Sequence, residues 1–448
     1  MPQLLSILQT ICVMGIVLGF MILIHEFGHY AAAKYFGVRV EQFAIGFGKR
    51  LVGFRRGETD YRINILPLGG YVKMSGENPM DDRTGDPGEF LSHPRWHRFV
   101  IAIAGPAMNV LLAFCLWTGV FMVHYEYPAM IDGPALVGWV MPGTPAANAG
   151  MQAGDEIVRV DDIQNPTWEQ VGYKEALSPN QPLKFEYLRK GVISDVTLVP
   201  KPQGRNQSGD VGLVPREPAF IATLIEPGMP AEKAGLKVGD QIVAVNGQEI
   251  PATEALVDMM SRTKDQPLDI EALRNGQKLN FKVAPVLSPS RATGETRYRI
   301  GLASFPTKVV RLPFGEAVQK SVRECVKNSS LILELLRKMV QHKVSLKQVD
   351  GPIGIGSAVG AAARDGWSSL LFVSAIISLN LGVMNLLPIP ILDGGVILLL
   401  FIESLMKKDI SLPIKERIYQ AAFVFLVLFA VTVIYNDIVK VSGLTHMP

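Results

Sequence analysis

The chain has 448 residues, enough for several domains. Its net charge of +3 and the lack of a lysine- and arginine-rich tract argue against a nucleic-acid partner. The mean hydropathy is +0.23, but long apolar runs near both ends flank a central region of ordinary soluble composition. The three cysteines form no C-x-x-C pair, which argues against a thiolate zinc site or a disulfide framework.

The first apolar run extends from Leu4 to Ile24 without a charge and is long enough to cross a bilayer as a helix. No Lys or Arg precedes it and no small-residue cleavage site ends it, so we expect a retained transmembrane helix and not a cleaved signal peptide. Three further apolar runs follow, at Phe99 to Val123, Ser368 to about Ile402, and Tyr419 to Tyr435. The simplest prediction is a polytopic α-helical membrane protein with four spans.

Basic residues between the spans predict the orientation of the chain. They are concentrated in two loops, which follow the first and the third span and lie on the same side in a four-span arrangement. The positive-inside rule makes that side cytoplasmic. We therefore expect both termini and the central region, about 125 to 367, to lie outside the cytoplasm.

The central region contains an internal repeat. G-T-P-A from Gly143 matches G-M-P-A from Gly228, and G-D from Gly154 matches G-D from Gly239, so both pairs differ by 85 residues (228 − 143 and 239 − 154). Each copy alternates short β-prone runs with a helical stretch. The repeat predicts two copies of one small β-rich fold, joined by a linker at about Pro200 to Gly209.

Two other segments have a recognisable pattern. Tyr61 to Met74 is β-prone and broken by Pro67 and Gly69-Gly70, which predicts a hairpin. Its exposed edge would capture an unwound peptide by β-addition, although an ordinary cytoplasmic hairpin fits equally. Leu312 to Lys343 has the apolar periodicity of an amphipathic helix, either on the outer membrane surface or packed on its own domain.

The end of the first apolar run reads His25-Glu26-Phe27-Gly28-His29. If the helix continues through it, His25 and His29 lie one turn apart on one face, where two imidazoles can bind one Zn²⁺. Glu26 can then take a proton from a water that the metal activates. Because two His and one Glu are costly inside a bilayer, the pattern predicts a zinc hydrolase with its active site within the membrane.

A catalytic zinc needs at least one more protein ligand. Asp393 is the candidate, because it lies inside the third apolar run and a buried aspartate needs a partner. Pro388, Pro390 and the glycines after Asp393 would open the helix there. The alternative is an aspartate that caps a broken helix or faces a cytoplasmic vestibule. No His or Cys in the third or fourth span competes for the role.

A second histidine pair, His93 and His97, has the same spacing but no acid between its members. Pro94 disfavours a helix at His93, so we interpret the pair as an interfacial anchor.

Three asparagines lie within the predicted spans. Asn109 is expected to hold helices together, because a buried amide must be hydrogen-bonded. Asn380 and Asn385 lie near Asp393 and either join helices or bind the extended backbone of a substrate. In the second case Asn385 would help to stabilise the oxyanion.

These residues resemble the site-2 protease family of intramembrane zinc metalloproteases over nearly the whole chain. The matching patterns are H-E-x-x-H in the first span, G-P-x-x-N in the second, N-x-x-P-x-P-x-L-D-G in the third, and two PDZ-like domains between them. The resemblance implies Zn²⁺ as cofactor, with the ligands His25, His29 and Asp393 and the catalytic base Glu26. It also implies a membrane-associated re-entrant β-element for substrate binding around Gly69, Gly70 and Tyr71. One departure is Val396, where close relatives often carry His.

The resemblance further implies a bacterial inner-membrane enzyme of regulated intramembrane proteolysis in a stress response, with periplasmic PDZ domains and termini. Its substrates would be single-span membrane proteins of the anti-sigma factor type, trimmed outside by an upstream site-1 protease, or remnant signal peptides. The PDZ pair would exclude untrimmed substrates by size. Alternatively, one PDZ groove would bind the newly exposed C-terminus.

The predicted domains are residues 1–124 with the zinc motif and β-loop, 125–215 and 216–308 as PDZ-like domains, 309–367 as an amphipathic juxtamembrane region, and 368–448 with the last two spans. Two other classes of function make different demands on the sequence. A non-catalytic PDZ membrane scaffold would not need Glu26 between two histidines. A metal transporter would need further His or Asp pairs along its spans, and the sequence has none there.

Overall fold

The computed structural model describes residues 2–77, 85–128, 130–131, 133–204, 206–217, 219–289, 296–304 and 307–442. The chain divides into two compact units. Unit 1 comprises Met1–Tyr125, Val310–Arg337 and Val349–Pro448, and unit 2 comprises Glu126–Val309 and Lys338–Gln348.

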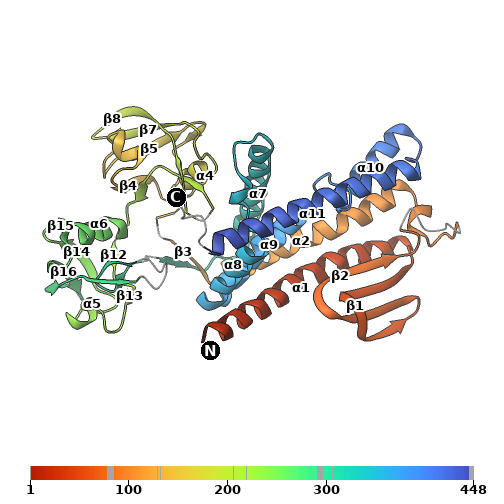
Figure 1. Ribbon diagram of the computed structural model, residues 1–448, viewed down its shortest axis with the longest axis horizontal. Coiled ribbons are helices and arrows are strands. Elements are labelled where there is room, and N and C mark those ends of the chain that lie inside the picture. Colours follow the sequence, from red (N-terminus) through yellow and green to blue (C-terminus); the bar gives the residue numbers. More distant parts are fainter. Residues whose placement is uncertain are drawn as a thin grey trace. The chain divides into compact units, whose positions relative to one another are not determined.

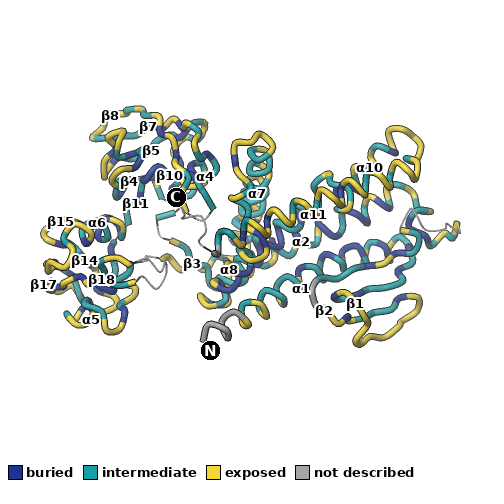
Figure 2. Tube along the Cα trace, viewed as in Figure 1, coloured by how far each residue is buried: buried dark blue, intermediate teal, exposed yellow. Residues whose placement is uncertain are grey.

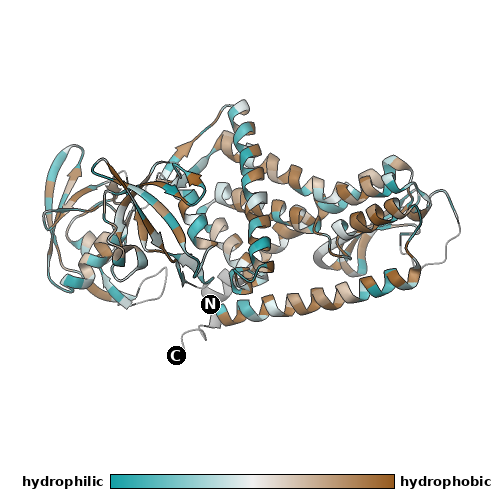
Figure 3. Cartoon of the chain, turned by 90° about the horizontal axis from the view of Figure 1, so that it is seen from above, coloured by the Kyte–Doolittle hydropathy of each residue, from teal (hydrophilic) through white to brown (hydrophobic). Residues whose placement is uncertain are grey.

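Long apolar helices build unit 1 (Figure 1). They are α1 (Pro2–Phe36), α2 (Arg95–Val123), α9 (Trp367–Asn385) and α11 (Leu412–Ser442), and each contains a stretch long and apolar enough to cross a membrane. These stretches match the four predicted runs, and Figure 3 colours much of the long helices brown, for hydrophobic residues. Helix α2 contacts both α1 and α9, and it carries the buried residues Trp117 and Phe121 of this core.

The third predicted run forms two helices. Helix α9 ends at Asn385, and α10 (Asp393–Met406) begins after a short irregular segment that contains Pro388 and Pro390. Prolines lack the backbone donor that a continuous helix requires. Two further helices of unit 1 are α7 (Phe314–Val340), whose last residues belong to unit 2, and α8 (Pro352–Asp365). The 3₁₀ turn Leu346–Gln348 between them also belongs to unit 2.

The β-element after α1 is larger than predicted. Strands β1 (Val40–Arg56) and β2 (Thr59–Met74) form a sheet in which residues 40–45 lie between two segments of β2. Ile45, for example, pairs with Ile63 on one side and Gly70 on the other. Tyr61–Met74 is therefore not a hairpin by itself. Among the described residues, the segment 70–74 pairs on one side only and forms an edge of this sheet. A 3₁₀ turn, Phe90–Ser92, leads to α2.

Unit 2 contains two β-rich copies (Figure 1). The first has the sheet order β11-β4-β5-β7-β8, with β6 on β5. Its elements are β4 (Ala135–Val140), α3 (Pro145–Asn148), β5 (Glu156–Val160), β6 (Ile163–Gln164), α4 (Trp168–Ala176), β7 (Leu183–Arg189), β8 (Val192–Leu198), β9 (Lys201–Gln203), β10 (Ser208–Asp210) and β11 (Leu213–Pro215).

The second copy has the sheet order β12-β14-β16-β17, with β15 on β14. Its elements are β12 (Phe220–Ile221), β13 (Leu224–Ile225), α5 (Pro230–Lys233), β14 (Gln241–Val245), β15 (Gln248–Glu249), α6 (Thr253–Thr263), β16 (Leu268–Arg274), β17 (Gln277–Val283), β18 (Val286–Pro289), β19 (Thr296–Arg299) and β20 (Leu302–Ala303). Strands β3 (Tyr125–Pro128) and β21 (Thr307–Val310) pair with each other.

The predicted repeat is confirmed as a structural one. Elements α5, β14, β15, β16 and β17 each begin and end 85 residues after α3, β5, β6, β7 and β8. Each copy has its own apolar core, and Figure 2 shows buried residues along the strands of both copies.

The repeated residues also share one ion pair. Asp155 accepts two hydrogen bonds of 2.6 Å from Arg189, which also donates to the Gly150 carbonyl. The equivalent contacts in the second copy join Arg274 to Asp240, at 2.7 Å, and to the carbonyl of Gly235. The repeated residues of the A-G, G-D and L-R patterns therefore have a structural role.

The predicted linker at Pro200 to Gly209 is wrong. Strands β9 and β10 form a hairpin there, and the chain returns as β11 to pair with β4. The segment therefore belongs to the first copy. A composition rich in Gly, Pro, Ser and Asn is typical of turns as well as of linkers, so it does not distinguish the two.

Candidate active site

Three side chains from two distant parts of the sequence converge in unit 1. His25 and His29 project from α1, and Asp393 is the first residue of α10. The Nε2 atoms of the two histidines lie 3.2 Å apart, and Asp393 carboxylate oxygens lie 3.2 Å from His25 Nε2 and 3.4 Å from His29 Nε2. Tetrahedral zinc with bonds of about 2.0–2.1 Å requires ligand atoms roughly 3.3 Å apart, so the three groups fit the metal. No second such group occurs among the described residues.

Glycines allow the helices to approach closely enough for this geometry. A Cβ atom on Gly105 would lie 2.2 Å from His29 Nε2, and one on Gly28 would lie 2.4 Å from the Ala104 carbonyl oxygen. A Cβ on Gly394 would lie 2.3 Å from the backbone of Leu386. The glycines of H-E-F-G-H and L-D-G are therefore required by contact with backbone, and the glycine of G-P-x-x-N by contact with the His29 ring.

Both histidines have a partner on the ring nitrogen that faces away from the cluster. His29 Nδ1 lies 2.8 Å from the Ile101 carbonyl oxygen, which makes Nδ1 the protonated nitrogen and leaves the Nε2 lone pair for a metal. His25 Nδ1 lies 3.3 Å from the Asn109 amide. Sequence reasoning assigned Asn109 to helix packing, and this contact was missed because nothing local in the sequence indicates it.

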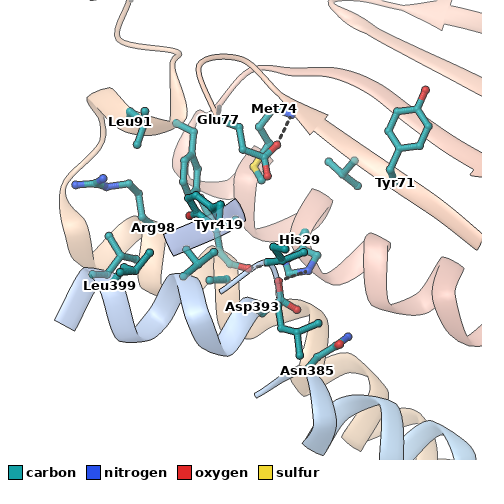
Figure 4. A pocket seen from close by; sticks show the side chains of 18 of the residues that line it. His29, Tyr71, Met74, Glu77, Leu91, Arg98, Asn385, Asp393, Leu399 and Tyr419 are labelled. Carbon is teal, nitrogen blue, oxygen red and sulfur yellow. Dashed lines mark hydrogen bonds and ion pairs between the residues drawn. The ribbon is translucent and has the colours of Figure 1, made fainter. Parts of the chain in front are cut away.

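A cavity of about 460 Å³ opens beside the cluster (Figure 4). Glu26 and Asp393 line it together with Tyr71 and Val72 from the edge segment of β2. The Val72 amide donates to Glu26 Oε2 at 3.0 Å. The carboxylate of Glu26 is therefore bound to the edge segment, and both face the same cavity.

The far wall of the cavity contains polar residues that sequence reasoning missed. Glu403 is 1% exposed and forms a 2.6 Å ion pair with Lys415 from α11. Arg98 and Tyr419 line the same region. An acid near the end of an apolar run, with a lysine shortly after it, was the available signal for this pair.

The other predicted residues lie as follows. Asn385 lines the cavity, and its amide is 3.4 Å from His25 Nε2, whereas Asn380 is not among the lining residues. Gly69, with φ +93°, and Gly70 precede Tyr71 in the edge segment. Val396 also lines the cavity.

His93 and His97 contact each other at 3.1 Å, and His97 stacks on Phe36. The pair lies outside the candidate metal group, and its interpretation as an interfacial anchor stays a prediction.

Comparison with known proteins agrees with this geometry. The model of peptidase family M50 matches residues 13–429. The chain belongs to peptidase family M50. It is 32% identical to Protease RseP of Yersinia pestis, over 97% of this chain and 99% of the relative. It is 30% identical to the Regulator of sigma-E protease RseP of Escherichia coli, with the same coverage, and 31% identical to a Vibrio cholerae protein named as a zinc metalloprotease.

Membership of family M50 makes the chain a zinc metalloprotease of the site-2 type, and its four apolar helices make it a polytopic membrane protein. The resemblance stated from the sequence is therefore confirmed at the level of the family.

Proposed function

We propose that this protease hydrolyses a peptide bond within the transmembrane segment of single-span membrane proteins. One observation carries the proposal. Two histidines of an apolar helix and an aspartate from another part of the chain form a metal-sized triangle beside Glu26 and an open sheet edge. Charged and polar groups are costly at membrane depth, and catalysis accounts for that cost.

His25, His29 and Asp393 would hold the metal, and the Ile101 carbonyl would keep the His29 ring in its orientation. When bound, Zn²⁺ supplies Lewis acidity that makes water more acidic and polarises a carbonyl group. Glu26 then takes the proton of the attacking water and delivers it to the leaving amine nitrogen.

The substrate has to be unwound, because the amides of a helix are inaccessible. The edge segment 70–74 would pair with an extended peptide in the manner of an added strand, and the Val72 amide would then exchange its bond to Glu26 for one to the peptide. Gly69 and Gly70 let this edge pack closely against Phe47 and Ala44 of β1, and Tyr71 lines the cavity where the peptide would lie. The Asn385 amide would donate to the oxyanion that forms on the attacked carbonyl, and Asn380 lies on the same helix.

The basic loops support an orientation with the metal site accessible from the cytoplasm and unit 2 on the periplasmic side of a bacterial inner membrane. The two β-rich copies are proposed to be PDZ-like domains that exclude substrates with a bulky outer domain. Substrates of the anti-sigma factor type would then need trimming by an upstream protease, and remnant signal peptides would need none. The names of the RseP relatives support the first class.

The test is cleavage of a purified single-span substrate by the native protein and by Glu26→Gln. The variant keeps the shape of the side chain and removes the base, so we expect roughly a 10³-fold slower cleavage with zinc content unchanged. A chelator should stop the native enzyme, and zinc should restore it. Cleavage by Glu26→Gln at the native rate would refute the assignment of the base.

The size-exclusion role has its own test. Deletion of residues 130–290 should accelerate cleavage of an untrimmed substrate, with the trimmed substrate as reference. Equal exclusion of the untrimmed substrate after the deletion would refute the filter and leave the catalytic proposal intact.

A further inference from the structure

The active-site cavity contains a carboxyl group that the proposed mechanism does not use. Glu77 follows β2 and lines the cavity together with Glu26 and Asp393. Its Oε2 atom accepts a hydrogen bond of 3.3 Å from the Met74 amide. Figure 4 shows the Glu77 side chain at this contact, in the same cavity as His29 and Asp393. A peptide that enters the cavity therefore meets Glu77 as well as the metal ligands.

Glu26 and Glu77 bind alternate amides of the same strand. The Val72 amide donates to Glu26 Oε2 at 3.0 Å, and the Met74 amide donates to Glu77. Alternate amides of an extended strand point to the same side, and residues 70–74 pair with β1 on the other side. An added peptide strand therefore takes both donors and releases both carboxylates, at points about 7 Å apart along the strand. Glu26 then serves the reaction, whereas Glu77 needs another partner.

Glu77 has no cationic partner within the described part of the chain. Lys415, which also lines the cavity, forms its 2.6 Å ion pair with Glu403. Arg98 is 6% exposed, and among the described residues no ion pair joins it to Glu77. A substrate group can therefore supply the positive charge that Glu77 lacks.

The surroundings of Glu77 favour a cation. Although the residue is exposed toward the cavity, burial of its carboxyl group raises the pKa of Glu77 above the ordinary value. The charges of Glu26 and Asp393 raise this pKa further, whereas the Met74 amide and His29 lower it. Strand addition removes the Met74 hydrogen bond, so the ionised carboxyl group needs a positive charge more in the complex than in the free enzyme.

The proposed substrates carry such a charge close to the cleaved segment. Lys and Arg are enriched at the cytoplasmic ends of membrane spans, and the proposed orientation opens the metal site to the cytoplasm. The distance of about 7 Å along the edge corresponds to about two residues of an extended peptide. The length of a lysine or arginine side chain extends this reach to roughly four residues from the scissile bond.

We propose that Glu77 binds the substrate by pairing with a lysine or arginine on the cytoplasmic flank of the cleaved segment. The pair fixes how far the substrate slides along the edge segment 70–74, and it thereby selects the peptide bond that reaches Glu26. The inference rests on the proposed function, because it concerns the substrate of the same site.

The test uses the full-length, zinc-loaded protein in detergent and single-span peptides whose cytoplasmic flank is uncharged except at one position. That position holds lysine, norleucine or glutamate, and it is moved in steps of one residue along the flank. With the residue within reach of Glu77, we expect kcat/KM to be about fivefold higher for lysine than for norleucine, and lowest for glutamate. Mass spectrometry of the products should show that the cleaved bond moves with the lysine.

Two variants at Glu77 and one control decide whether this residue is responsible. Glu77→Gln should lose both the difference between lysine and norleucine and the movement of the cleaved bond. Glu77→Lys should reverse the order and favour the glutamate peptide. Glu58→Gln removes the same charge from the same sheet outside the cavity, where Glu58 pairs with Lys34, and should keep the lysine preference. The zinc content of all three variants should equal that of the native protein.

Four results would overturn the inference. They are equal kcat/KM values for lysine and norleucine in the native enzyme, an unchanged lysine preference in Glu77→Gln, the same loss of preference in Glu58→Gln, and loss of zinc or of all cleavage in both Glu77 variants. The last result counts because a residue that only selects the substrate does not abolish the chemistry. Failure of the native enzyme to cleave any of the peptides would instead refute the proposed function itself, so the two failures are distinguishable.

Discussion

Two buried clusters, one in each unit of this protein, hold charge in opposite ways. In unit 2, Asp155 and its repeat equivalent Asp240, 85 residues later, each accept two hydrogen bonds from an arginine. In unit 1, the cluster of His25, His29 and Asp393 brings three potential ligand atoms together without a cation of its own. A buried polar group whose hydrogen bonds are all made within the protein indicates a structural role. A cluster of buried polar groups that needs a bound ion or ligand indicates a functional site.

The largest effect is expected from breaking the cluster of unit 1. Asp393→Asn keeps the shape and removes the charge that offsets the metal, so zinc binding and proteolysis should both be lost. Zinc per chain, measured after gel filtration, checks the first effect. Since Glu26→Gln should keep its zinc, the pair of variants separates ligand from base. Full zinc content in Asp393→Asn would show that the cluster does not hold the metal.

The corresponding change in unit 2 should be structural only. Asp155→Asn leaves Arg189 half-paired, and Arg189 is partly exposed, so we expect a loss of about 2 kcal/mol in local stability. Hydrogen exchange of the amides in residues 135–198 measures this loss. Asp195→Asn, from an exposed pair with Lys184, is the control and should cost less than about 0.5 kcal/mol. Altered zinc content in Asp155→Asn would contradict a purely structural role for the Asp155–Arg189 pair.

A pH dependence should distinguish the first copy from the second, because burial raises the pKa of Glu175 in α4 to about 8. Below the ordinary pKa of 4.5, Glu175 is protonated in both folded and unfolded chains. Between pH 4.5 and about 8 only the unfolded chain ionises, so this group lowers stability by up to about 1.4 kcal/mol per pH unit, with no further change above pH 8. Hydrogen exchange, corrected for its intrinsic pH dependence, should show this slope in the native chain and a smaller one in Glu175→Gln. Identical slopes would contradict the buried state of the carboxyl.

The smallest effect concerns the support of His25. The Asn109 Oδ1 atom is buried without a hydrogen-bond partner, and turning the amide would let it accept from His25 Nδ1–H. Asn109→Ala should therefore lower zinc affinity about 10-fold, measured by competition with a chelating dye. Ser378→Ala removes a contact to the Asn109 backbone carbonyl and serves as the control. Equal zinc affinities of Asn109→Ala and the native chain would show that Asn109 serves helix packing only.

The sequence predicted those features that depend on local patterns. Apolar runs predicted the spans, and the offset of matching residues predicted the two copies to the residue. The pairing of His25 with Asp393 could be predicted because few polar residue types are tolerated within membrane spans. Three features could not be predicted, because each depends on pairing between residues that the local pattern does not connect. They are the position of residues 40–45 between two segments of β2, the contact of Asn109 with His25, and the hairpin at 201–210.

The close approach at Gly105 has a mechanical consequence. With no side chain between them, the backbone of α2 is the surface against which the His29 ring is seated. Any sliding or tilting of α1 against α2 therefore displaces the His29 ring directly. In the proposed metal site, the spacing of α1 and α2 would therefore set the position of the His29 ring.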